Sequence, residues 1–524
     1  MQKLRMVLWL VPFLLMGFWN PFRAPVELTV LAGSELKDIE PLLDRIEKET
    51  GIALKLEYTG TLDGAERLLG GAEASQPDLA WFSHGKYLTL LQGNQRLIQA
   101  QEKIMLSPVV LGVKESLARR WGWYNNPDVT WNDIADKARS GELLYGMTNP
   151  ASSNSGFTAT LAITAALSGK GEALTAADID APRLSAVARG QQLTAGSSGW
   201  IADAYVAAQD RLGGLFNYES VLMQMNSGGQ LRETLHLIYP RDGIVTADYP
   251  LMLINPQRRG DYDKLVAFLK SPQMQSELME LTARRPAIPQ VRPDSRFPQR
   301  LLLEIPFPNS ARVVDEILLA FLDSIRKPSH SVFVLDVSGS MAGERMDALK
   351  AAVQNLTGVD TSMSGRFSRF RGRERITIIA FNDRVESTTT IEVGLGTVAA
   401  SDPAMQEIRT LVTAFKANGG TAIYSALSHA YGVVAQARKT DPERFYSIVL
   451  MSDGDNRSGL NFSEFRSAHA ALPEGLRQVR TFPILFGDAN EAEMKALAQL
   501  TGGRPFDGRQ ANLGPVFKEI RGYQ

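Results

Sequence analysis

An apolar run that stops abruptly at three oxygen-bearing side chains constrains the fold of this chain most. Residues 332–335 show no polar alternation, which predicts a strand buried on both faces of a parallel sheet. Asp336, Ser338 and Ser340 follow in a turn at the carboxyl end of that strand, where open α/β sheets place their binding sites. One carboxylate and two hydroxyls form an oxygen-only ligand set, which suits Mg²⁺ or Mn²⁺ and does not suit zinc or copper.

Two later stretches offer further oxygen ligands. Thr421 stands at the start of a helical pattern, and a second apolar strand at residues 445–451 runs into Asp453. In residue types, order and spacing, the combined set resembles the metal-ion-dependent adhesion site of von Willebrand factor A domains: Asp336, Ser338, Ser340, Thr421 and Asp453. The resemblance implies that this set holds Mg²⁺ or Mn²⁺, with Asp453 acting through water. It also implies that an acidic residue of a partner protein completes the coordination.

The alternative for these residues is a nucleotide-binding α/β domain in which Ser, Thr and Asp side chains only cap helices. The sequence has no Walker A motif, no Gly-x-Ser-x-Gly elbow and no His-Glu-x-x-His pair. Asp336 and Asp453 could form an acid–base pair, but no histidine base or nucleophile lies near them in the sequence. We therefore predict a binding protein and not an enzyme.

Length and composition bound the number of domains and the class of partner. A chain of 524 residues exceeds what one hydrophobic core supports, so two or three domains are expected. The formal charge of −1 provides no basic field for nucleic acid. The sequence has no cysteine, which excludes disulfides, thiolate metal sites and cysteine nucleophiles. Its five histidines have no metal-ligand spacing, and we interpret them as structural or surface residues.

The amino terminus has the pattern of an export signal. Lys3 and Arg5 precede residues 6–19, a run of 14 residues without charge, which is short for a spanning helix of about 20 residues. We predict that residues 1–25 are a signal peptide or an uncleaved signal anchor, and favour the anchor because no clear cleavage site follows. Either reading places the rest of the chain in the periplasm or at the cell surface. A short amphipathic or buried helix is the alternative.

Residues 26–290 repeat a strand, a Gly/Ser-rich turn and a helix. Helical spacing at residues 36–49 follows the first strand, and a long polar loop at residues 149–156 leads into another helix. Together with residues 28–34, this loop resembles a two-lobed, type II periplasmic solute-binding protein. Residues 107–114 and 244–250 are similar to the segments that cross between the lobes of such proteins.

That resemblance implies a small ligand, an anion or a peptide, bound by serines at helix amino termini. The candidates are Ser34, Ser83, Ser153, Ser155 and Ser198. The alternative is that these serines only cap helices. No arginine in these loops matches a specific anion site, so the cleft could also have lost ligand binding.

The second half of the chain begins with a linker. Prolines and arginines mark residues 291–328 as the linker, which ends in an amphipathic helix at residues 311–325. Residues 329–524 alternate strands and helices, which predicts a Rossmann-like, doubly wound von Willebrand factor A domain behind the two-lobed α/β domain. Within it, residues 365–375 contain five arginines, which we interpret as a solvated loop or a docking segment for an acidic partner.

The expected function is an exported, membrane-tethered binding protein that docks a protein partner through Mg²⁺ and carries a module for a small solute. The alternatives are a solute receptor of a transport system, an assembly factor for an envelope complex and a metal-dependent hydrolase, for which no nucleophile is present.

Overall fold

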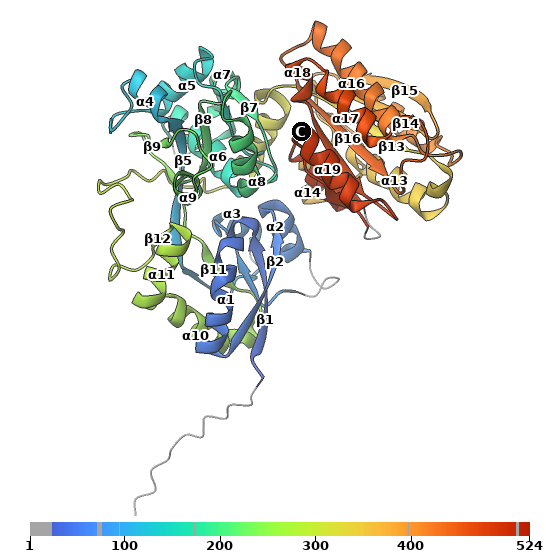
Figure 1. Ribbon diagram of the computed structural model, residues 1–524. Helices are drawn as coiled ribbons and strands as arrows, with labels where there is room; N and C mark the ends of the chain where they lie inside the picture. The colour runs from blue at the N-terminus through green and yellow to red at the C-terminus, as the bar shows by residue number, and fades with distance from the viewer. Residues whose placement is uncertain (1–23, 71–75, 94, 171–173, 397, 510–512) are drawn as a thin grey trace, which may run out of the picture.

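The computed structural model describes residues 24–70, 76–93, 95–170, 174–396, 398–509 and 513–524. Three α/β units are visible: two lobes that share the first part of the chain, and a C-terminal domain beside both (Figure 1). Within these residues no helix is long and apolar enough to cross a bilayer. The predicted export segment, residues 1–25, lies almost wholly outside the described residues.

Lobe 1 is built on a sheet with the strand order β2-β1-β3-β11-β4. Its strands are β1 Val26–Gly33, β2 Ile52–Thr59, β3 Leu79–Trp81, β4 Ala100–Lys103 and β11 Pro250–Leu253. Its helices are η1 Ser34–Leu42, α1 Leu43–Thr50, α2 Thr61–Leu69, α3 Lys86–Leu91, η4 Pro256–Arg258, α10 Arg259–Leu269 and α11 Pro272–Thr282. The prediction of a single helix at residues 36–49 is wrong in one respect. The first part is a 3₁₀ helix that contains Pro41, whose missing N–H cannot join an α-helical ladder.

Lobe 2 is built on a sheet with the order β10-β5-β8-β6-β7, in which β9 and β12 also pair with β5. Its strands are β5 Met105–Lys114, β6 Tyr145–Gly146, β7 Gln191–Leu193, β8 Gly214–Tyr218, β9 Leu235–Ile238, β10 Val245–Ala247 and β12 Arg285–Pro286. Its helices are α4 Glu115–Arg120, α5 Trp131–Arg139, α6 Asn154–Ser168, η3 Ala176–Asp178, α7 Ala181–Ala188, α8 Ser198–Ala208 and α9 Glu219–Ser227.

The chain passes between the lobes where the sequence predicts crossings. β4 of lobe 1 leads into β5 of lobe 2, and β10 of lobe 2 leads back into β11 of lobe 1. β5 and β10 are antiparallel neighbours, with Val109 opposite Val245. The two crossings therefore run side by side and form a two-stranded connection.

The C-terminal domain contains a sheet with the order β15-β14-β13-β16-β17-β18, parallel except for the antiparallel edge strand β15. Its strands are β13 Ser329–Asp336, β14 Arg375–Phe381, β15 Val385–Glu392, β16 Phe445–Ser452, β17 Arg480–Leu485 and β18 Phe506–Asp507. Its helices are η6 Gly339–Met341, α13 Glu344–Gln354, η7 Asn355–Val359, α14 Met363–Ser368, α15 Pro403–Thr413, α16 Ile423–Thr440, α17 Phe462–Ala470, α18 Glu474–Arg477, α19 Glu491–Thr501 and α20 Gly514–Arg521.

Strand β13 explains why this sheet is covered on both faces. Its side chains alternate, so that Phe333 and Leu335 enter one core while Val332 and Val334 enter the other. All four are at most 1% exposed. The unbroken apolar run in the sequence therefore predicts the doubly wound fold correctly.

The predicted linker helix is present as α12 Ala311–Ala320, extended by the π-helical turn η5 Phe321–Ile325. Its apolar face joins the core of the two lobes, where Val314, Ile317 and Leu318 are fully buried. On its polar side, Asp315 accepts a hydrogen bond from the Tyr87 hydroxyl of lobe 1 at 2.7 Å. The linker is thus packed onto the lobes over its helical part.

The arginine-rich segment, residues 365–375, begins inside helix α14, which the sequence did not predict. The segment docks parts of this chain against one another. Its ion pairs join the linker helices and the last helix: Arg366–Asp315, Arg371–Asp323, Glu374–Arg326 and Glu374–Arg521. At the other end of α14, Glu66 of lobe 1 accepts hydrogen bonds from the backbone N–H of Met363 at 3.0 Å and of Ser364 at 3.1 Å. This carboxylate therefore caps a helix of the neighbouring domain.

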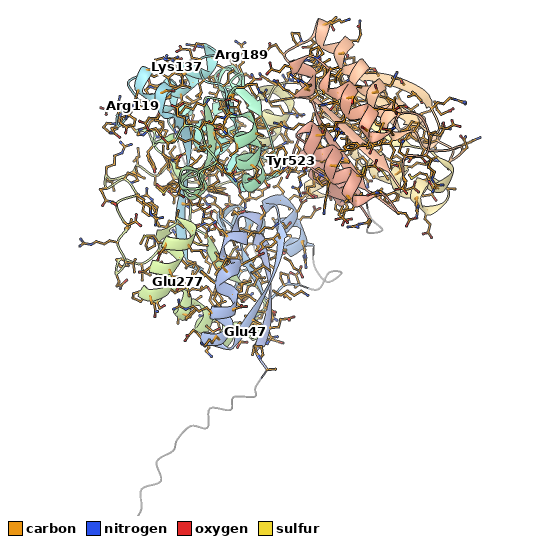
Figure 2. All side chains as sticks on the ribbon, viewed as in Figure 1. Glu47, Arg119, Lys137, Arg189, Glu277 and Tyr523 are labelled. Carbon is orange, nitrogen blue, oxygen red and sulfur yellow. The ribbon has the colours of Figure 1, made fainter. Side chains whose placement is uncertain are left out.

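The chain's last residues dock on lobe 2. The Tyr523 ring lies 5.0 Å from the Trp200 ring of α8, between lobe 2 and the C-terminal domain (Figure 2). It also covers Gly196, where an added Cβ would come within 2.5 Å of the ring. Glycine is needed here because the two domains approach this closely.

Candidate functional site

Asp336 lies at the carboxyl end of β13 and is fully buried. Its Oδ1 accepts a hydrogen bond from the Ser338 backbone N–H at 2.8 Å, and its Oδ2 accepts one from the Ser452 hydroxyl at 2.6 Å. Burial raises the pKa of this carboxyl above its ordinary value, and the bonds from Ser452 and Ser338 lower it in part. The side chain is therefore held in one position by Ser338 of its own turn and by Ser452 at the end of the adjacent strand β16.

Three other predicted members, Ser338, Ser340 and Asp453, form a hydrogen-bonded chain beside Asp336. The Ser338 and Ser340 hydroxyls are 3.0 Å apart, and the Ser340 hydroxyl donates to Oδ1 of Asp453 at 2.7 Å. The second carboxylate oxygen of Asp453 pairs with Arg345 at 2.6 Å. The same guanidinium contacts the exposed Asp488 at 2.9 Å. Arg345 thus compensates the charge of Asp453.

The loop that carries Thr421 is held against this turn by backbone bonds. The Gly339 N–H donates to the Gly419 carbonyl at 3.0 Å, and the Asn418 N–H donates to the Val337 carbonyl at 2.9 Å. Gly419 has a φ of 74°, in the left-handed region that favours glycine. Thr421 itself is only 3% exposed. Asp336 ends β13, and the other four predicted residues lie in loops that meet at the same edge of the sheet, where the parallel strands have their carboxyl ends.

The donor set of this edge fits a hard cation. No cluster of three or more His, Cys, Asp or Glu side chains suited to a metal occurs within the described residues, so a site here depends on hydroxyl ligands. Two carboxylates, one of them paired with Arg345, and three hydroxyls match the oxygen ligands that Mg²⁺ prefers. Such a set gives little reason to expect Zn²⁺, which prefers nitrogen and sulfur.

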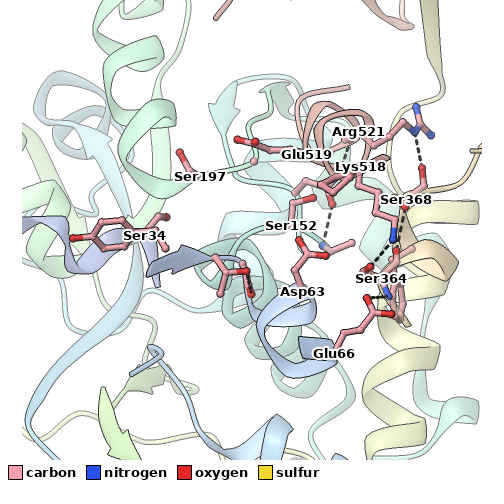
Figure 3. Close-up of a pocket in the computed structure, with 18 of the residues that line it drawn as sticks. Ser34, Asp63, Glu66, Ser152, Ser197, Ser364, Ser368, Lys518, Glu519 and Arg521 are labelled. Carbon is pink, nitrogen blue, oxygen red and sulfur yellow. Dashed lines mark hydrogen bonds between the residues drawn. The ribbon is translucent and has the colours of Figure 1, made fainter. Parts of the chain in front are cut away.

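Of the five serines predicted to bind a solute, one lines a cavity and four are buried away from it. Ser34 begins η1 and lines a cavity of about 610 Å³ at the meeting point of the lobes and the C-terminal domain (Figure 3). Ser153 and Ser155 are buried and hydrogen-bonded to each other at 3.3 Å. Ser198 is buried inside the first turn of α8. Ser83 is fully buried, and its hydroxyl has no partner among the described residues.

The residues beside two of these serines line the cavity instead. They are Ser152 and Ser197, each one position earlier in the sequence than the predicted Ser153 and Ser198. The sequence analysis also missed the basic lining of this cavity, because none of it comes from the serine loops. The basic side chains are Lys37, Arg67, Arg326, Arg371, Arg504, Lys518 and Arg521.

Deeper between the lobes, polar groups are buried without partners. The Tyr218 and Tyr249 hydroxyls and Oδ1 of Asn154 have no hydrogen-bond partner among the described residues. Nδ2 of Asn154, in lobe 2, donates to Glu35 of lobe 1 at 2.9 Å and so bridges the lobes. Burial raises the pKa of Glu35, although the bond from Asn154 opposes that shift. Unpaired buried groups are uncommon, and two of these belong to neighbouring rings, Tyr218 and Tyr249, whose centres are 6.1 Å apart.

Comparison with known proteins divides the chain in the same way. Residues 28–280 match the family described as bacterial extracellular solute-binding protein, and residues 331–456 match the von Willebrand factor type A domain. Inter-alpha-trypsin inhibitor heavy chain H3 of Mesocricetus auratus is 32% identical over 135 residues, which are 25% of this chain and 14% of that protein. An uncharacterised protein of Synechocystis is 29% identical over 136 residues, or 26% of this chain and 27% of that protein. The chain thus matches only a small part of these curated relatives.

Solved structures of periplasmic binding proteins are similar to part of this chain. The periplasmic binding protein AfuA from Actinobacillus pleuropneumoniae has a TM-score of 0.47 at 13% identity, covering 57% of this chain and 98% of AfuA. The apo ferric ion-binding protein A of Pasteurella haemolytica has a TM-score of 0.45 at 12% identity, covering 56% and 96%. By the two family matches, this chain carries a bacterial extracellular solute-binding domain followed by a von Willebrand factor type A domain.

Proposed function

We propose that this protein is an exported binding protein whose type A domain holds Mg²⁺ or Mn²⁺ and docks an acidic residue of a partner protein. The observation that carries the proposal is the meeting of Asp336, Ser338, Ser340 and Asp453 at one sheet edge, joined by hydrogen bonds. Solute-binding and type A domains are typically non-catalytic binding modules, and we propose no enzymatic activity. The solute-binding domain supplies a second site, for a small anion or peptide.

The charges of the edge favour an acidic partner. Asp336 supplies one negative charge, and the hydroxyls of Ser338, Ser340 and Thr421 supply neutral oxygens. Arg345 neutralises Asp453, so the site carries little net negative charge of its own. When bound, Mg²⁺ supplies a positive centre that accepts a carboxylate oxygen. The fixed turn of residues 337–339 keeps the protein's own oxygens in place while the partner binds.

We further propose that the protein acts in the periplasm or at the cell surface. A bacterial extracellular solute-binding domain is consistent with that compartment. The apolar run at residues 6–19 would anchor the chain in the inner membrane. Both modules would then face partners and solutes outside the cytoplasm.

Replacing Asp336 by alanine tests the metal site, and Asp488→Ala is the matched control. Asp488 contacts the same Arg345 but is 86% exposed and outside the proposed set. Manganese binding by the full-length protein, followed by electron paramagnetic resonance, should fall at least about 100-fold in Asp336→Ala, because the only charged direct ligand is removed. It should stay within about threefold in Asp488→Ala.

The partner is tested with the same two variants on a solid support. Envelope proteins that bind wild-type protein in Mg²⁺, and are released by a chelator, should be absent from Asp336→Ala and present with Asp488→Ala. Unchanged manganese binding in Asp336→Ala would overturn the metal site. Equal capture by all three proteins would overturn metal-dependent docking alone.

A further inference from the structure

The cavity of about 610 Å³ is walled by every part of the molecule. Lobe 1 contributes Ser34 and Asp63, and lobe 2 contributes Ser152. The linker contributes Arg326, and the type A domain contributes Lys518 among others. Figure 3 shows Lys518, Glu519 and Arg521 of α20 on the side of the cavity that faces Ser152 and Asp63. Its volume lies within the range of small-molecule sites, about 300–1,000 Å³.

The walls are predominantly basic. Of the described residues that line the cavity, seven are Lys or Arg and three are Asp or Glu. Two of the acidic groups, Asp63 and Glu519, have a pKa raised by burial, which favours their uncharged form. Most of the basic side chains also pair with carboxylates of this chain, such as Arg371 with Asp323 and Lys518 with Asp360. Arg326 and Arg521 share the single carboxylate of Glu374, so this wall keeps an excess of positive charge that attracts anions.

Arg371 offers an unused donor in this wall. The residue is 1% exposed and contacts Asp323 at 3.2 Å through one terminal nitrogen and the Arg366 carbonyl through the other. Its Nε–H has no acceptor among the described residues. A buried guanidinium donor without an acceptor is costly, so an acceptor supplied by a bound molecule would be favourable.

Helix amino termini from both lobes point their partial positive charge toward the same region. Gly60 is the N-cap of α2 and Ser197 is the N-cap of α8, and both line the cavity. Gly60 has no side chain with which to satisfy the first N–H groups of α2. These termini add to the basic side chains as partners for an anion.

We propose that this cavity binds a small organic anion with a phosphate or carboxylate group and several hydroxyls, and that the type A domain completes the site. The inference rests on the proposed solute-binding function and assigns its ligand class. The charged group faces the basic wall. The ligand's hydroxyls pair with the serine hydroxyls of the lining: Ser34, Ser152, Ser197, Ser364 and Ser368. A ligand in this place contacts both lobes and the type A domain, so its binding is coupled to their docking.

The test uses calorimetry on the full-length protein with inorganic phosphate, citrate, glucose 6-phosphate and glucose. Lys37→Glu reverses a lining charge from lobe 1, and Arg504→Glu reverses one from the type A domain. The control is Lys55→Glu, an exposed lysine on β2 of lobe 1 that does not line the cavity. We expect at least one anion to bind and glucose to bind at least about tenfold more weakly. Each lining variant should weaken the anion about tenfold, and Lys55→Glu less than about twofold.

The possible outcomes separate the inference from the functions on which it rests. A preference for citrate or for glucose 6-phosphate identifies the carboxylate or the phosphate as the charged group. Weakening by Lys37→Glu but not by Arg504→Glu keeps the solute-binding function and overturns the shared site. No binding of any of the anions at millimolar concentration overturns the inference and this ligand class together. The Asp336→Ala variant should bind the anion as wild type does, which shows that the metal site is separate.

Discussion

The edge that carries the proposed metal site and the interdomain cavity are built in opposite ways. The edge is made within one domain, and the turn that contains Asp336, Ser338 and Ser340 supplies most of its oxygens from five consecutive positions. The cavity is made by side chains whose partners lie far away in the sequence, such as Arg521 and Glu374, 147 positions apart. A local site depends on one strand and its turn, whereas a shared site depends on how domains dock. Variants that disturb docking should therefore affect the cavity and leave the edge intact.

The largest effect is expected from Glu374→Gln. Glu374 is 1% exposed and pairs with both Arg326 and Arg521, so its loss leaves two guanidinium groups buried without a counter-charge. We expect the free energy of unfolding to fall by about 3–5 kcal/mol. Urea unfolding of the full-length protein measures this. Manganese binding in the absence of urea should remain, because the edge does not use this network.

The matched control is Glu392→Gln. Glu392 is 55% exposed and pairs with Arg375, so this substitution removes an ion pair at the surface. That change should cost less than about 1 kcal/mol. Equal costs in the two variants would contradict the view that the buried network holds the domains together. A loss of manganese binding in a folded Glu374→Gln protein would contradict the independence of the edge.

The same carboxyl predicts how stability depends on pH. Burial alone would raise the pKa of Glu374, but Arg521 and Arg326 bring it below its ordinary value of 4.5. An acid with a lowered pKa in the folded state stabilises the protein above its unfolded pKa. That contribution is lost as the pH falls from about 4.5 through the lower folded value. Wild type should lose stability in this window more steeply than Glu374→Gln.

A smaller and more selective loss of domain docking is expected from Gly196→Leu. An added Cβ at this position would come within 2.5 Å of the Tyr523 ring, so the larger side chain should displace the chain end and open the cavity. We expect a loss of about 1–3 kcal/mol and weaker anion binding, with metal binding unchanged. Limited proteolysis should cut the linker and the chain end faster than in wild type.

Gly199→Ala is the control, since Gly199 lies three residues further on, in the first turn of α8, and its added Cβ would meet nothing within 4 Å. It should be neutral or slightly stabilising. Proteolysis of Gly196→Leu at the wild-type rate would show that Tyr523 and Gly196 do not hold the domains together.

The difference between the two sites also explains what the sequence could predict. The core of β13 and the turn after it are local, and apolar periodicity together with residue order places both correctly. The lining of the cavity depends on details that periodicity does not contain. Ser152 and Ser197 line it where Ser153 and Ser198 were predicted. Helices α6 and α8 begin only at Asn154 and Ser198, and the N-cap residues before them have an extended backbone, in which neighbouring side chains point to opposite sides.

The partners of the arginines could not be predicted for a different reason. From the sequence alone, residues 365–375 could be interpreted as a solvated loop or as a segment that docks an external partner. Their partners proved to be carboxylates of this chain, including Asp315 and Asp323 of the linker helices. Charge runs do not reveal which distant segment they face, so the basic wall could only be seen once the domains were docked.

The smallest effect is expected from Glu35→Gln, which tests a carboxyl that bridges the two lobes. Burial raises the pKa of Glu35, so the folded state favours its protonated form and loses stability as the pH rises through and above the ordinary value of 4.5. Glutamine keeps an oxygen that can accept the bond from Asn154 but carries no charge. We expect a small gain in the free energy of unfolding at pH 7 and none at pH 3. Thermal unfolding at both values, with the exposed Glu47→Gln as control, measures the difference. A similar gain at both values would mean that the charge of Glu35 is not the cause. Loss of stability at pH 7 would instead show that the ionised carboxylate, beside Arg284, holds the lobes together.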